Sequence, residues 1–172
     1  MYTVNFDKYF DLISWDCIYW GIRKQLIEPE NAVIYANKII KNNPDGDTPE
    51  IIELLIIDKA DNESVLPLIE RMFLDKKDLE KKKSSALRML RLILLLEIKE
   101  TATDNQGLLD EAEKIYADFN YPSDMECFIS YMPVRDDKYD VSKHSLQENL
   151  QRLADKFNMF ADREFKALVP NL

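Results

Sequence analysis

The chain has 172 residues and a formal net charge of −9, with 46% hydrophobic residues and only three glycines. The apolar fraction is enough for one sizeable core, and the shortage of glycine beside many Leu, Ile, Glu and Lys residues argues against a β-rich domain. We therefore expect one all-α domain over residues 1–172, a multi-helix bundle whose short helices could stack as pairs.

The first half of the chain is predicted to form five helices from their caps and from the 3.6-residue spacing of apolar side chains. Ser14 has the position of an N-cap, and Pro29 and Pro49 each fall at a first helical position. Pro67 either lies in the first turn of its helix or kinks it. The five helices are predicted over residues 5–13, 15–27, 29–43, 49–57 and 61–75.

The longest helical pattern covers residues 76–100 and is almost wholly apolar from Leu87 to Ile98. A helix that is apolar on all sides is buried, so this one is predicted to run through the centre of the fold. Its basic start, residues 76–91, could touch phosphates, but a solvated helix start is the favoured interpretation because no aromatic residue is interleaved for base stacking.

The second half contains two capping-box spacings, Ser123 with Glu126 and Ser145 with Glu148. Between an amphipathic helix and the first box, Pro122 breaks the chain because proline disfavours helix in the residue before it. The helices of this half are predicted over residues 108–119, 124–132 and 146–169, the last with an apolar side that includes Leu146 and Phe157.

Several features indicate the cellular compartment. The N-terminal segment MYTVNFDKYF lacks the basic region and apolar run of a signal peptide. The longest apolar run, residues 92–98, is far shorter than the roughly 20 residues of a membrane span. Cys17 and Cys127 are too few for a disulfide framework and are both predicted to be buried, reduced thiols. We therefore expect a cytoplasmic protein.

Side chains suited to catalysis are sparse. His144 is the only histidine, and a solvated loop residue is favoured over a catalytic one. Three scattered glycines cannot form a phosphate-binding loop, and the two cysteines lack zinc-site spacing. We expect no catalytic residue, no metal and no cofactor, and hence no enzyme. An enzyme that uses His144 and nearby carboxylates stays open as an alternative.

Negative charge is concentrated in residues 101–140, which hold ten acidic and three basic residues. Such a concentration of negative charge attracts basic partners over a distance and repels nucleic acid. Solvation alone would also explain these charges, and capping would explain Asp124 and Glu126. A second possible anchor is the aromatic group Trp15, Tyr19 and Trp20, for which core packing is favoured over an interface role. The predicted partner-binding residues are Asp118, Asp124, Glu126, Asp136, Asp137 and Asp140.

The segment YADFNYPSDMECFISYMP, residues 116–133, resembles the signature of a bacterial family of small all-α proteins classed as a domain of unknown function. SWDCIYWGI (residues 14–22) and AVIYAN (residues 32–37) resemble the other landmark of that family, so the resemblance spans nearly the whole chain.

The family in turn resembles the immunity proteins of polymorphic and contact-dependent toxin systems. This resemblance implies an antitoxin that neutralises a cognate toxin, typically a basic nuclease, by covering its active site or substrate-binding surface. We also expect no nucleic-acid partner, no membrane partner and no small-molecule substrate. A non-catalytic helical adaptor without a toxin partner is the alternative.

Overall fold

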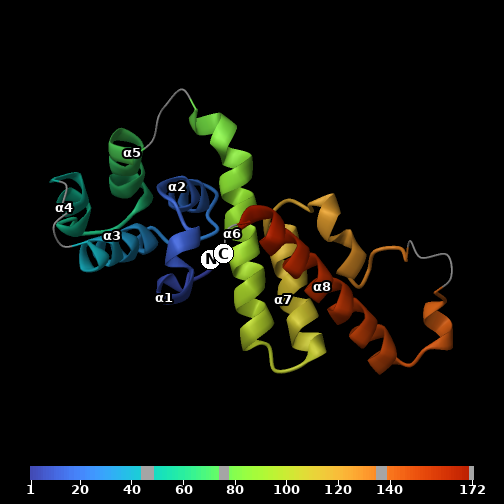
Figure 1. Cartoon of the computed structure of the whole chain (residues 1–172). Helices are drawn as coiled ribbons and strands as arrows, with labels where there is room; N and C mark the ends of the chain where they lie inside the picture. Colours follow the sequence, from blue (N-terminus) through green and yellow to red (C-terminus); the bar gives the residue numbers. More distant parts are fainter. Residues whose placement is uncertain (44–48, 74–77, 135–138, 171–172) are drawn as a thin grey trace. The chain divides into compact units, whose positions relative to one another are not determined.

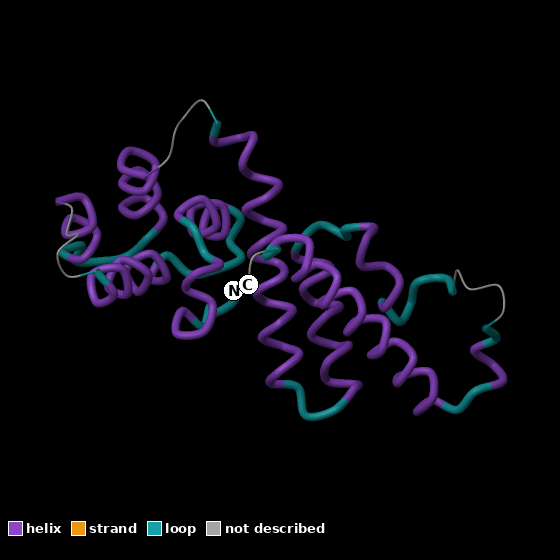
Figure 2. Tube along the Cα trace, viewed as in Figure 1, coloured by secondary structure: helices purple, strands orange, loops and turns teal. Residues whose placement is uncertain are grey.

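The computed structural model describes residues 1–43, 49–73, 78–134 and 139–170. Over these residues the protein is all-α, as its composition predicted, and Figure 2 draws only helices and loops. The β-type pairing found there is an isolated bridge between Tyr2 and Ile27. The chain divides into two compact units, Met1–Ile93 and Leu94–Leu172. The expectation of one domain stays a prediction.

The N-terminal unit, Met1–Ile93, consists of short helices and the first part of a long one (Figure 1). Its elements are α1 (Phe6–Tyr9), the 3-10 helix η1 (Phe10–Leu12), α2 (Trp15–Arg23), α3 (Glu30–Asn42), α4 (Pro49–Leu55), α5 (Asn62–Phe73) and the start of α6 (Leu79–Thr101). Within this unit α2 packs on α5, α4 lies against α3 and α5, and α1 contacts α3. Tyr19 and Trp20 are fully buried on α2, which confirms core packing for these two side chains.

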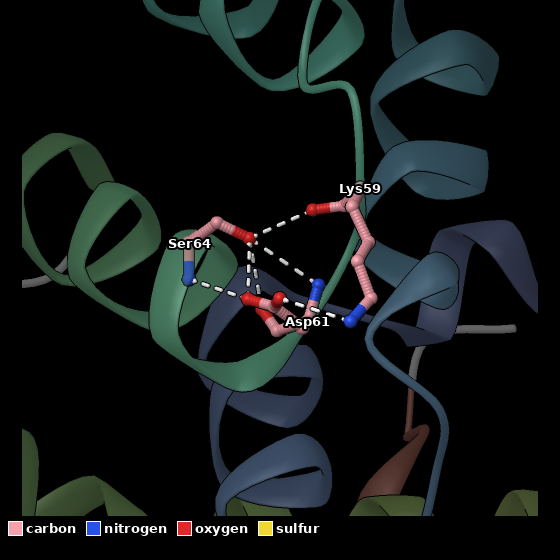
Figure 3. Close-up of polar contacts among 3 residues, drawn as sticks. All are labelled: Lys59, Asp61 and Ser64. Carbon is pink, nitrogen blue, oxygen red and sulfur yellow. Dashed lines mark hydrogen bonds and ion pairs between the residues drawn. The ribbon is translucent and has the colours of Figure 1, made fainter.

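Local hydrogen bonds explain where the helices of this unit begin. Ser14 caps α2 as predicted, because its Oγ accepts the backbone N–H of Cys17 at 3.4 Å. At the start of α5, Asp61 Oδ1 accepts the Ser64 N–H at 3.0 Å, and Ser64 Oγ accepts the Asp61 N–H at 3.2 Å (Figure 3). This reciprocal cap begins α5 at Asn62, so Pro67 lies inside the helix rather than in its first turn.

The long helix α6 has six consecutive buried residues, from Leu90 to Leu95. The set includes Arg91, which is only 6% exposed. Burial on every side of the helix agrees with the prediction made from its apolar stretch.

The C-terminal unit, Leu94–Leu172, contains the end of α6 and most of the predicted functional residues. Its other elements are α7 (Asn105–Asp118), the 3-10 helices η3 (Ser123–Phe128) and η4 (Val141–Lys143), and α8 (Leu146–Leu168). Both α7 and η3 pack against α8. At the centre of that packing, the Phe128 ring lies 5.4 Å from the ring of Phe157 and 5.2 Å from that of Phe160. None of the helices in the described ranges has both the length and the hydropathy needed to cross a membrane.

Candidate functional site

The candidate site begins at the corner that ends α7. Asn120 and Tyr121 both have positive φ, 63° and 57°. The Tyr121 N–H donates to the Tyr116 carbonyl at 2.9 Å, and the Asn120 N–H donates to the Ala117 carbonyl at 3.0 Å. These two bonds form a Schellman motif, which satisfies carbonyls that the helix end would otherwise leave unpaired. Asn120 suits the left-handed position, whereas a bulky side chain such as that of Tyr121 is uncommon there and costs free energy.

The strained residue is held by aromatic packing. The Tyr121 ring meets the buried Tyr116 ring edge-on at 5.3 Å, and Tyr131 lies 6.5 Å from the same ring. Tyr121 and Tyr131 are nevertheless each 59% exposed. The side chain of Glu113 accepts hydrogen bonds from the backbone N–H and the Oγ of Ser130, which tie the residue before Tyr131 to α7. The corner thus presents two tyrosines on a backbone fixed from both sides.

The segment after the corner, Ser123–Phe128, differs from the helix that was predicted to begin with a capping box. It forms the 3-10 helix η3, with Pro122 at the N-cap and no side-chain cap bond, so the predicted capping box of Ser123 and Glu126 is wrong. A 3-10 helix has three residues per turn, which aligns positions i and i+3. Met125 and Phe128 therefore point together into the core, and both are completely buried.

The same geometry corrects the prediction for Cys127. Its thiol was predicted to be buried, but the side chain is exposed because η3 turns Phe128, not Cys127, toward the core. Cys17 is buried as predicted, and that burial raises the pKa of its thiol. The two thiols therefore differ in their access to solvent.

Four of the six predicted partner-binding residues lie in the described part of the chain. Asp118 and Asp124 are exposed on either side of the corner, and Glu126 is half-buried in η3. Asp140 is exposed too, but it already caps η4. Asp136 and Asp137 lie outside the described residues.

Asp140 belongs to a tightly bonded turn. It accepts hydrogen bonds from the Ser142 Oγ at 2.7 Å and the Ser142 N–H at 3.1 Å, and lies 3.2 Å from the ammonium of Lys143. The Ser142 hydroxyl, then Lys143, lower the pKa of the Asp140 carboxyl. Much of its charge is thus compensated locally, which weakens Asp140 as a candidate for partner binding.

His144 packs against Tyr139, with the two rings parallel within 6° and 4.5 Å apart. The Tyr139 hydroxyl donates to Asn149 Oδ1 at 2.8 Å, and Asn149 Nδ2 donates to the His144 carbonyl at 3.3 Å. Next along the chain, Ser145 and Glu148 form the predicted capping box at the start of α8. Residues 139–145 are therefore fastened to α8 rather than loosely connected to it.

A partly enclosed cavity of about 300 Å³ lies between η3 and the first half of α8. Sequence patterns did not predict it, because its walls come from separate stretches between residues 123 and 156. Leu146, predicted on the apolar side of α8, is instead 73% exposed and lines this cavity. The exposed thiol of Cys127 and the half-buried Glu126 belong to the same lining.

The profile of a bacterial protein family, described as an uncharacterized protein conserved in bacteria (DUF2247), matches residues 6–164. The chain belongs to DUF2247. The match includes the corner, η3 and every residue that lines the cavity, so the candidate site lies within the DUF2247 region. No curated protein and no solved structure matches the chain.

Proposed function

We propose that this DUF2247 protein is a cytoplasmic immunity protein that binds and neutralises a cognate bacterial toxin, a nuclease with a basic substrate site. The observation that carries the proposal is the corner after α7, where a strained, exposed Tyr121 lies between the exposed Asp118 and Asp124. Residues 116–133 resemble the signature of a family that in turn resembles the immunity proteins of toxin systems, and this resemblance supports the same function.

Charge supports the choice of a basic partner. Residues 101–140 carry an excess of seven negative charges. Exposed charges of one sign raise the rate of encounter with an oppositely charged surface, and like-charge repulsion discourages other acidic proteins and nucleic acid. The side chains of Asp118 and Asp124 would meet lysines and arginines that the nuclease uses for its own substrate.

Aromatic side chains support a protein partner. Tyrosine is enriched at the energetic centres of interfaces, because it buries a large area while losing few rotamers. Tyr121 and Tyr131 are already fixed by Tyr116, so little further ordering would be needed on binding. Backbone strain is often retained at functional positions, and a positive φ at Tyr121 fits that pattern.

The first test is the gene neighbourhood, which should contain a toxin gene beside this one. That toxin domain is then produced with and without the immunity candidate. Co-expression should restore growth, and the purified protein should inhibit the nuclease in vitro. Association rates should then be measured against ionic strength for wild type and for the double variant Asp118→Lys, Asp124→Lys. A matched control is Asp11→Lys, Asp58→Lys, which reverses two exposed carboxylates in the N-terminal unit.

At low salt the corner variant should associate at least about tenfold more slowly than the control variant, and the difference should shrink as salt rises. Equal rates for the two variants would remove the corner from the binding face. Failure of co-expression to protect against any neighbouring toxin would refute the immunity function and favour a helical adaptor.

A further inference from the structure

The cavity between η3 and α8 is lined by an apolar wall and by two positively charged side chains. Arg152 and Lys156 both line it from α8, against the single acidic side chain of Glu126. The apolar wall is formed by Ile129, Met132, Val141, Leu146, Leu150 and Leu153. Arg152 and Lys156 thus place positive charge opposite η3, which belongs to the acidic stretch 101–140.

The polar atoms of Arg152 are incompletely satisfied. Its guanidinium lies 4.2 Å from the centre of the Tyr139 ring, while Nε and Nη1 are buried with no hydrogen-bond partner among the described residues. Buried donors of this kind cost free energy unless an acceptor reaches them. Both nitrogens have almost no accessible surface, so the guanidinium must turn away from the Tyr139 ring before an oxygen acceptor in the cavity can reach them. A negatively charged acceptor would favour this movement most strongly.

Lys156 adds a second reason to expect an anion. It follows Arg152 by four residues, and side chains at that spacing lie on the same face of a helix, where like charges repel. Within the described part of the chain, Lys156 forms no ion pair that would offset this repulsion. An anion bound near both side chains would convert the repulsion into attraction.

We propose that this cavity binds a small amphipathic carboxylate, with its apolar body against the aliphatic wall and its carboxylate oxygens toward Arg152 and Lys156. A cavity of about 300 Å³ is at the lower end of the range for small-ligand sites. It has the volume of about ten water molecules, which is sufficient for a medium-length acyl chain. The proposal does not depend on the toxin-binding function.

Cys127 provides a direct measurement of occupancy, because its exposed thiol lies in the cavity lining. The neutral reagent 4,4′-dithiodipyridine reacts when a thiolate attacks its disulfide and releases thiopyridone, which absorbs light. Cys17 should react far more slowly, since it is 3% exposed and burial raises the pKa of its thiol. The fast phase in the native protein therefore reports the reaction of Cys127 at the cavity lining.

The experiment adds octanoate, octan-1-ol or octylammonium and records the rate of the fast phase. At ten times its Kd, octanoate should slow the reaction about tenfold, because only the unoccupied protein reacts. Octan-1-ol should bind more weakly, and octylammonium should give the least protection. Absence of protection by millimolar octanoate, or equal protection by all three compounds, would overturn the proposal.

Variants then test the two cations. Lys156→Gln and Arg152→Gln should each weaken octanoate binding about tenfold or more, by loss of a charge-assisted hydrogen bond. The control Lys166→Gln removes an exposed lysine of the same helix outside the cavity and should bind octanoate as wild type does. Arg152 also packs on Tyr139, so circular dichroism must confirm folding of that variant, whereas Lys156→Gln removes no such packing. Unchanged affinity in Lys156→Gln would refute anion recognition.

Discussion

Phe128→Ala tests how firmly η3 is anchored in the C-terminal unit. Phe128 is completely buried and packs against the rings of Phe157 and Phe160. Truncation of a buried phenylalanine costs about 3–5 kcal/mol, and each lost aromatic pair accounts for roughly 0.5–1.5 kcal/mol. Phe128→Ala removes both pairs, and we expect the free energy of unfolding to fall by about 4 kcal/mol, near the middle of the range for a buried phenylalanine.

Urea unfolding followed by far-ultraviolet circular dichroism measures this loss, since the C-terminal unit contributes much of the helix signal. Tryptophan fluorescence, recorded in the same titration, follows the N-terminal unit, because Trp15 and Trp20 are the two tryptophans of the chain and both lie in α2. If the chain is one cooperative domain, Phe128→Ala shifts both transitions together. Separate transitions, with the fluorescence midpoint unchanged, would contradict the single-domain expectation.

The matched control is Cys127→Ala, which changes the adjacent but exposed side chain and should alter stability by no more than about 0.5 kcal/mol. A loss below about 1 kcal/mol for Phe128→Ala would mean that η3 is not held by this packing. The structural account of the exposed Cys127 would then fail as well.

Three further predictions concern other elements. A Cβ at Gly21 would lie 2.9 Å from atoms of the buried Ile27 and Leu90. Gly21→Ala should therefore lower the free energy of unfolding in urea by about 1–3 kcal/mol, although alanine has the better helix propensity. A gain in stability would refute this prediction. Ser145→Ala should cost about 1 kcal/mol through loss of the α8 cap, measured in the same way. Hydrogen bonds from the Ser145 N–H and hydroxyl lower the pKa of the Glu148 carboxyl below its ordinary value of 4.5. The ionised carboxylate therefore stabilises the folded protein above pH 4.5, and this stabilisation is lost as pH falls through the lowered pKa. Glu148→Gln should therefore flatten the acid limb of the melting temperature against pH, and an unchanged limb would contradict this.

Local signals predicted much of the fold. Ser14 and the Ser145–Glu148 box marked helix starts correctly, because a cap is a contact between residues three apart and needs no knowledge of the rest of the chain. The same spacing failed at Ser123 and Glu126. There the requirement to bury side chains against α8 selected a 3-10 helix, and the packing partner lies some thirty residues further along the chain.

The candidate site was predictable only in part. Asp118 and Asp124 were identified from charge alone, and both prove to be exposed. The positive φ of Tyr121 could have been anticipated only from the Pro122 that follows it, which indicates a break but not its conformation. The cavity could not be predicted, because it exists only where η3, the turn near Val141 and α8 converge.

The acidic corner and the cationic cavity of the C-terminal unit differ in how strongly solvent screens their charges, which separates the two proposals. Asp118 and Asp124 are exposed, and at physiological ionic strength charges are screened over about 8 Å. Two nitrogens of Arg152 are buried, and buried charges are screened much less. Added salt should therefore slow toxin association steeply while weakening octanoate binding only slightly. A salt dependence of octanoate binding as steep as that of toxin association would place the carboxylate at the protein surface, outside the cavity.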